Sequence, residues 1–96
     1  MSLPLEFRGL IDKTFDEILG QISNPGWLSG MMEIFHLKVD EIPLFLKGYV
    51  TGTVTSTFLA LYHRTLTQEE LNEILGVVMK RSNEIYDKVA EYLDNL

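Results

Sequence analysis

The sequence predicts an all-α fold in which residues 1–96 form one helical, bundle-like domain, and three observations support this prediction. Apolar residues recur at intervals of three and four near both ends of the chain, as in amphipathic helices. A capping box from Thr67 to Glu70 opens the last of these segments. Between them lies a long apolar stretch whose only charged residues are Lys47 and Arg64, which predicts a central apolar helix.

The first predicted helix covers residues 5–23. Pro4 suits the first helical turn, where its missing N–H is no loss. From Phe7 to Phe15 and onward, apolar residues follow one face while most charged residues lie off it. The segment Asn24-Pro25-Gly26 ends this helix, because the residue before a proline avoids the helical conformation.

A second, shorter helix is predicted for residues 27–39, which are apolar on all sides. Trp27 follows a turn and could cover a pocket, but such aromatic residues more often pack on the core. The Met31-Met32 pair could likewise belong to an adaptable binding groove, and we favour core filling for it as well.

The third predicted helix, residues 42–65, is the one around which the other three are expected to pack. Its large apolar residues form one row at intervals of four, and its small residues form a second row about 200° away around the axis. The first row is Ile42, Leu46, Val50, Val54, Phe58, Tyr62 and Leu66, and the second is Gly48, Gly52, Ser56 and Ala60. A helix that is apolar on two sides should be covered on two sides. His63 and Arg64 are expected to place cations in its last turn.

Within this helix, residues 49–58 carry a conflicting signal. The segment is rich in threonine and valine and alternates with period two, which favours a strand. The chain contains no second good strand with which it could pair, and the flanking segments favour helix. We therefore predict helix here, with a strand formed by exchange with another subunit as the alternative.

The last predicted helix covers residues 68–95. Its apolar residues follow a heptad-like order, with spacings that alternate between four and three. The positions are Leu71, Leu75, Val78, Ser82, Ile85, Val89, Tyr92 and Leu96, of which Ser82 is polar. At 1.5 Å per residue the helix is about 45 Å long, so its end is expected to reach a second subunit.

Composition excludes several classes of function. The net charge is −6, and no cluster of Lys and Arg is present to neutralise phosphates, so we expect no nucleic-acid partner. The chain has no cysteine, which removes disulfides and thiolate chemistry. The apolar stretch contains Lys47, threonines and glycines, so we predict a buried helix and no membrane span. Early charges at Glu6 and Arg8 interrupt any signal-peptide pattern, and a cytoplasmic location is expected.

Carboxylates of the last predicted helix form pairs that are three residues apart. They are Glu70 with Glu73, followed by Glu84 with Asp87 or by Glu91 with Asp94. This E-x-x-E…E-x-x-D pattern resembles that of the all-α nucleoside triphosphate pyrophosphohydrolases. The resemblance implies a Mg²⁺-dependent hydrolase whose carboxylates hold the ion between two helices, and this is the alternative function. On one uninterrupted helix, however, Glu73 and Glu91 lie about 27 Å apart, so we favour an acidic face that is exposed to water.

Other signals of chemistry are incomplete. Glu33 and His36 have the Glu-x-x-His spacing of di-iron bundles, but such sites need a second motif. His63 cannot supply it, because Ala60 stands where the acid should be. No nucleophile elbow or Gly-rich phosphate loop is present. The sequence therefore predicts no catalytic residue, no metal site and no cofactor.

The row of small residues is the predicted interface. Its members are Gly48, Gly52, Ser56 and Ala60. Without large side chains, such a row lets another backbone approach closely. The row could serve a helix crossing inside the chain, a seam with a second copy, or a cleft beside the hydroxyls of Thr51 and Thr55. We expect a small acidic helical interaction module that forms a homodimer, with another protein as the alternative partner.

Overall fold

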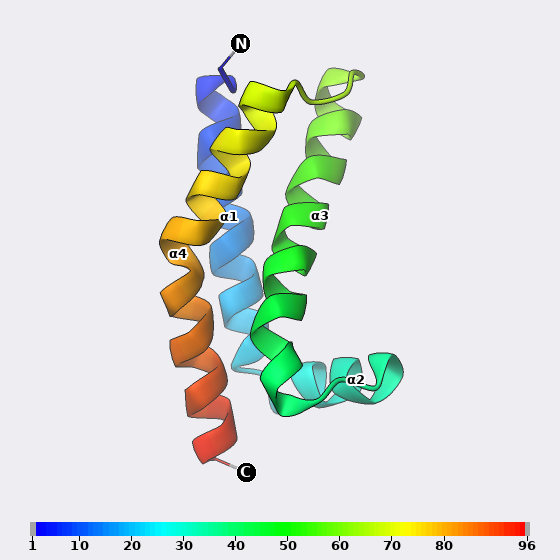
Figure 1. Ribbon diagram of the computed structural model, residues 1–96, viewed down its shortest axis with the longest axis vertical. Helices are drawn as coiled ribbons and strands as arrows, with labels where there is room; N and C mark the ends of the chain where they lie inside the picture. Colours follow the sequence, from blue (N-terminus) through cyan, green and yellow to red (C-terminus); the bar gives the residue numbers. More distant parts are fainter. Residues whose placement is uncertain (1, 96) are drawn as a thin grey trace.

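The computed structural model describes residues 2–95, and its regular secondary structure within that range is entirely helical (Figure 1). The helices are α1 (Leu5–Ile22), α2 (Pro25–Phe35), α3 (Ile42–Tyr62) and α4 (Gln68–Asp94), and a short 3-10 turn, η1 (Val39–Glu41), precedes α3. The prediction of an all-α fold is confirmed. The molecule measures 44 × 23 × 19 Å along its principal axes, so it is about twice as long as it is wide.

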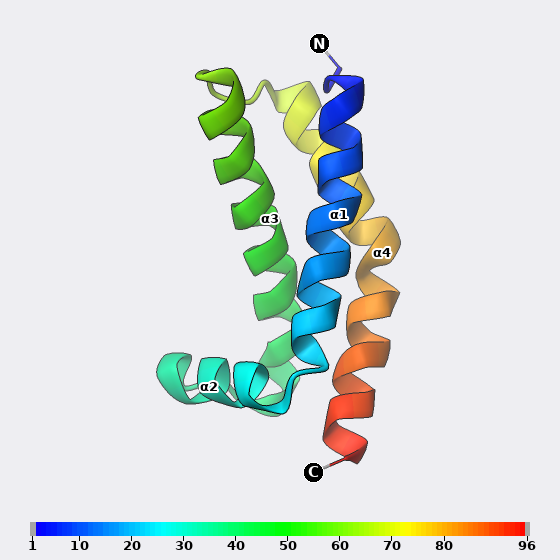
Figure 2. The ribbon, with the colours of Figure 1, turned by 180° about the vertical axis from the view of Figure 1, so that it is seen from behind.

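Three of the helices form the body of the bundle. Helices α1 and α4 run in one direction along the long axis and α3 runs in the other (Figures 1 and 2). Their inward-facing side chains make the core, which consists of Phe7, Ile11, Phe15, Ile18, Leu19 and Ile22 of α1, Ile42, Leu46, Val50, Val54 and Phe58 of α3, and Ile74, Val78, Ile85 and Val89 of α4, with Leu3 and Leu28. Helix α2 lies across one end of this bundle and projects sideways past α3 (Figures 1 and 2).

Helix α2 begins and ends earlier than the sequence predicted. The predicted range was 27–39, whereas the helix starts at Pro25, because the Asn24 side chain accepts a hydrogen bond from the Gly26 N–H and caps it. Pro25 then occupies the first helical position, where proline is favoured. The helix stops at Phe35 because His36 has a left-handed backbone, with φ of 53°.

Helix α3 confirms the prediction of helix over strand for residues 49–58. The hydroxyls of Thr51, Thr53 and Thr57 each donate to the carbonyl four residues earlier at 2.8 Å. These bonds give the threonine hydroxyls acceptors on the helix's own backbone, so their polar groups are satisfied without a neighbouring strand. The row of large residues from Ile42 to Phe58 follows the helical period into the core, and burial of that row outweighs the local preference for a strand.

Helix α3 ends at Tyr62 and not at residue 65 as predicted. His63 takes a left-handed backbone conformation, with φ of 52°, and closes the last turn. Arg64 therefore lies beyond the helix, so the predicted pair of cations in its last turn is wrong. Its guanidinium lies 4.8 Å from the centre of the Phe58 ring and bonds to Glu70 at the start of α4.

Helix α4 has the predicted capping box. The Thr67 hydroxyl accepts a hydrogen bond from the Glu70 N–H, and the Glu70 carboxylate accepts one from the Thr67 N–H. The core row in its first turns is shifted by one residue from the predicted heptad. Ile74 is fully buried and Leu75 is 40% exposed, because the buried Glu70 and Ile74 together face the bundle at an interval of four.

Candidate interaction surface

The outward face of α3 is open along its length. Gly48, Gly52, Ser56 and Ala60 are all exposed, on the side of the helix opposite the buried row. A Cβ atom added at Gly48 or Gly52 would meet no other atom within 4 Å. The chain therefore covers α3 on one side only, which differs from the expectation of cover on both. Within residues 2–95, the row of small residues therefore serves no crossing with another helix.

A shallow groove follows this face. Its middle is lined by Gly48, Tyr49, Gly52, Thr53, Ser56 and Thr57. At one end it shares Gly48 and Tyr49 with a hollow beside Leu44, in the elbow between α2 and α3. At the other end it shares Ser56 with a hollow beside Leu59. Gly48, Gly52 and Ser56 thus line shallow hollows along this face, and Leu44 and Leu59 lie toward its two ends.

The segment from Pro25 to Val39, here called the α2 arm, exposes several large apolar side chains. Ile34 is 69% exposed, Phe35 54% and Val39 51%, and Leu28 is the buried residue of α2. Trp27 and Met32 are partly buried against the core, as expected for core packing. We did not predict from the sequence that these side chains are exposed. The signal for it was that residues 27–39 are apolar on all sides, whereas a helix at the edge of a bundle buries one side.

Aromatic contacts hold the α2 arm against α3. The rings of Trp27 and Tyr49 lie 5.7 Å apart, and those of Phe35 and Phe45 lie 5.3 Å apart. A hydrogen bond between the Ser29 and Tyr92 hydroxyls ties the arm to α4. The arm therefore has a defined position before any partner arrives, which lowers the entropic cost of binding.

The outward face of α3 also carries no formal charge. Lys47 is the one charged residue between Ile42 and Tyr62. Its Nζ donates to the Tyr86 hydroxyl at 3.2 Å and lies 5.2 Å from the centre of that ring, so the ammonium group is turned toward α4. The acidic residues that give the chain its net charge lie outside α3.

The structure does not bring the candidate carboxylates of α4 together. The helix is unbroken, and carboxylates of different pairs contact different cations. Glu73 accepts a hydrogen bond from Arg8 at 3.1 Å, whereas Glu84 accepts bonds from Arg81 at 2.7 and 2.9 Å. The Glu91 carboxylate lies 3.7 Å from the Lys88 ammonium nitrogen, and Asp87 and Asp94 belong to the same helix. Within residues 2–95, no three acidic or histidine side chains are arranged to hold a metal ion.

Glu70 was predicted on an exposed acidic face, and this prediction is wrong. Its side chain is fully buried, and both carboxylate oxygens accept hydrogen bonds from Arg64, at 2.8 and 2.7 Å. These bonds, followed by the one from the Thr67 N–H, lower the pKa of Glu70 from 4.5 to about 2. The ionised carboxylate of Glu70 thus links the first turn of α4 to the loop that connects α3 and α4. The capping box was the signal for the Thr67 contact, but no sequence pattern identified Arg64 as its partner.

The two histidines lie apart. His36 follows α2 and His63 follows α3, and each is an exposed C-cap residue with a left-handed backbone. Helix α3 separates them, and its 21 residues span about 31 Å. The Glu33 to His36 spacing therefore does not form part of a paired site.

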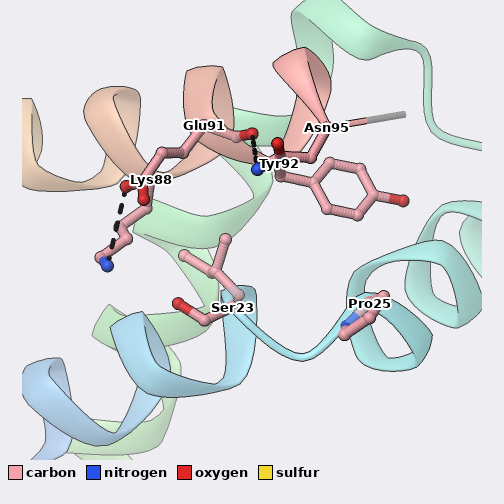
Figure 3. A pocket seen from close by; sticks show the side chains of 7 residues that line it. Ser23, Pro25, Lys88, Glu91, Tyr92 and Asn95 are labelled. Carbon is pink, nitrogen blue, oxygen red and sulfur yellow. Dashed lines mark hydrogen bonds and ion pairs between the residues drawn. The ribbon is translucent and has the colours of Figure 1, made fainter.

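A small pocket lies between the α1–α2 turn and the end of α4 (Figure 3). Its lining residues are Ile22, Ser23, Pro25, Lys88, Glu91, Tyr92 and Asn95. The polar groups of α4 bond to one another, since Lys88 pairs with the Glu91 carboxylate and Asn95 donates to the Glu91 carbonyl at 3.0 Å. No set of polar groups converges on the space, so we assign it no ligand.

No protein-family model matches this sequence, and neither a curated protein nor a solved structure shows a significant match to it. In the part of the chain that the structure describes, no helix is both long and apolar enough to cross a membrane. The residues themselves therefore supply the grounds for assigning a function.

Proposed function

We propose that this chain is a non-catalytic helical interaction module that self-associates through the outward face of α3 and the α2 arm. One observation carries the proposal: α3 has one face in the core, while its other face is uncharged and open to solvent from Leu44 to Ala60. Uncharged surface of small and hydroxyl-bearing residues, with the exposed Leu44 and Leu59 toward its ends, fits the centre of a protein interface, where charge is depleted.

The distribution of charge favours a second copy as the partner. Each chain carries a net charge of −6, so two copies that met through α1 or α4 would bring acidic side chains together. The outward face of α3 carries no formal charge, and the lysine of that helix is turned toward Tyr86. Association through α3 therefore brings two chains together where their mutual repulsion is weakest.

Solution mass measured by light scattering over a dilution series tests the proposal. The wild-type chain is expected to have the mass of a dimer at high concentration and that of a monomer on dilution. Gly52→Leu places a large side chain on the floor of the groove and is expected to abolish the dimer. Gly76→Leu is the matched control, since Gly76 is also an exposed glycine inside a helix with no atom within 4 Å of an added Cβ. A wild-type chain that is monomeric at every concentration would refute self-association.

A further inference from the structure

We propose that the second copy binds in the antiparallel orientation, with the two α3 helices crossing at Gly52 and each α2 arm reaching the C-terminal half of the partner's α3. This orientation rests on the proposed function, because it specifies how the two copies of the homodimer meet. On each side of the crossing, an α2 arm and the partner's α3 complete the interface.

The spacing of the small residues sets the crossing. Rows of residues at intervals of four pack into one another at an interaxial angle of about −50°. Two α3 helices that cross in this way touch near Gly52 and separate on both sides. The contact from Gly48 to Ser56 is about 12 Å long and about 10 Å wide, whereas a stable interface takes about 800 Å² from each partner. The crossing alone is too small, so other apolar surface has to contribute.

The α2 arm is placed to supply that surface. It lies at the N-terminal end of α3 and projects past it on the side away from α4 (Figures 1 and 2). In the antiparallel orientation, each arm lies beside the C-terminal half of the partner's α3. Leu59 is 53% exposed there, on the same side of α3 as Gly52, and it matches the exposed Ile34 and Phe35 of the arm in apolar character.

A parallel orientation uses this surface less well. It places both α2 arms at the same end of the dimer, where they project toward one another across the crossing. The diverging C-terminal halves of α3 would then leave Leu59 uncovered, with the 53% exposure that it has in the single chain. The antiparallel orientation covers both ends of the groove with apolar side chains, and its contacts are repeated about the twofold axis as in any symmetric dimer.

Cysteine cross-linking tests the orientation, because the wild-type chain contains no cysteine. Four single variants are made: Gly52→Cys, Gly48→Cys, Ser56→Cys, and Gly76→Cys as the exposed helical control. They are treated with a short thiol cross-linker, singly and as a mixture of Gly48→Cys with Ser56→Cys carrying tags of different mass. The antiparallel dimer predicts cross-linked Gly52→Cys, and predicts that the mixed pair reacts several-fold more than either of its members alone.

The results separate the orientation from the proposed function. Cross-linking of Gly48→Cys with itself, at a yield equal to or above that of the mixed pair, would overturn the antiparallel orientation while keeping the dimer. A wild-type dimer by light scattering, with no more cross-linking at Gly52→Cys than at Gly76→Cys, would also overturn this crossing. A monomeric wild-type chain would overturn the proposed function itself.

Discussion

Replacing Gly52 with alanine should change stability in opposite directions in the monomer and in the dimer. In the single chain the added Cβ meets no atom within 4 Å, so helix propensity alone decides the effect. Alanine is better than glycine inside a helix by about 1 kcal/mol. For a chain of this size, that gain raises the melting temperature by about 4–8 °C.

At high concentration the same methyl group would lie between two crossing backbones and push them apart. The wild-type melting temperature should rise with protein concentration, because association stabilises the folded chain, and that of Gly52→Ala should rise by less, because the methyl group weakens the association. Calorimetric scans of both proteins over a dilution series measure the difference. Gly76→Ala is the control, since it should give the gain of about 1 kcal/mol at every concentration.

Two results would refute this reasoning. If Gly52→Ala destabilises the protein even at high dilution, the row of small residues contacts another part of the same chain, against the structure. If Gly52→Ala and Gly76→Ala give the same gain at all concentrations, Gly52 does not lie in an interface.

Three further predictions concern charge. The lowered pKa of Glu70, about 2 against 4.5, means that its ionised form stabilises the folded state above pH 4.5 and that this contribution is lost as the pH falls toward 2. Acid titration of Glu70→Gln by circular dichroism should therefore show lower stability at neutral pH and a weaker loss between pH 4.5 and 2. Arg81 bonds to Asp12, Asp16 and Glu84, so Arg81→Gln should lower the free energy of unfolding by about 1 kcal/mol. The loss should be smaller in 1 M salt, which screens these ion pairs. Millimolar Mg²⁺ should leave the melting temperature unchanged; a clear rise would favour the hydrolase alternative.

Much of the fold followed from local patterns in the sequence. The Thr67 to Glu70 capping box marked the start of α4 correctly, because it depends on residues three apart that hydrogen-bond one another. The row of large residues from Ile42 to Phe58 predicted the buried face of α3 in the same way. Both signals depend on neighbours along one helix, and such neighbours are visible in the sequence.

What the sequence did not predict depends on contacts between segments. The burial of Glu70 requires Arg64, which reaches it from beyond the end of α3, and nothing in the spacing of carboxylates indicates that pairing. Because Glu70 faces the bundle, the buried residue one turn later is Ile74 and not Leu75. The row of small residues was visible, but whether it faces a neighbouring helix or solvent depends on where α2 lies, and its position across the end of the bundle is a tertiary property.

The weak burial of α2 also has a consequence for local dynamics. Leu28 is the fully covered side chain of this helix, so opening it exposes far less apolar surface than opening α1, α3 or α4. Helices of this kind open by themselves, with a free energy well below that of global unfolding. In a hydrogen-exchange experiment the amides of α2 should thus exchange before those of the bundle. A partner that covers the α2 arm would slow exchange there first, so this segment reports on binding while the rest of the molecule stays closed.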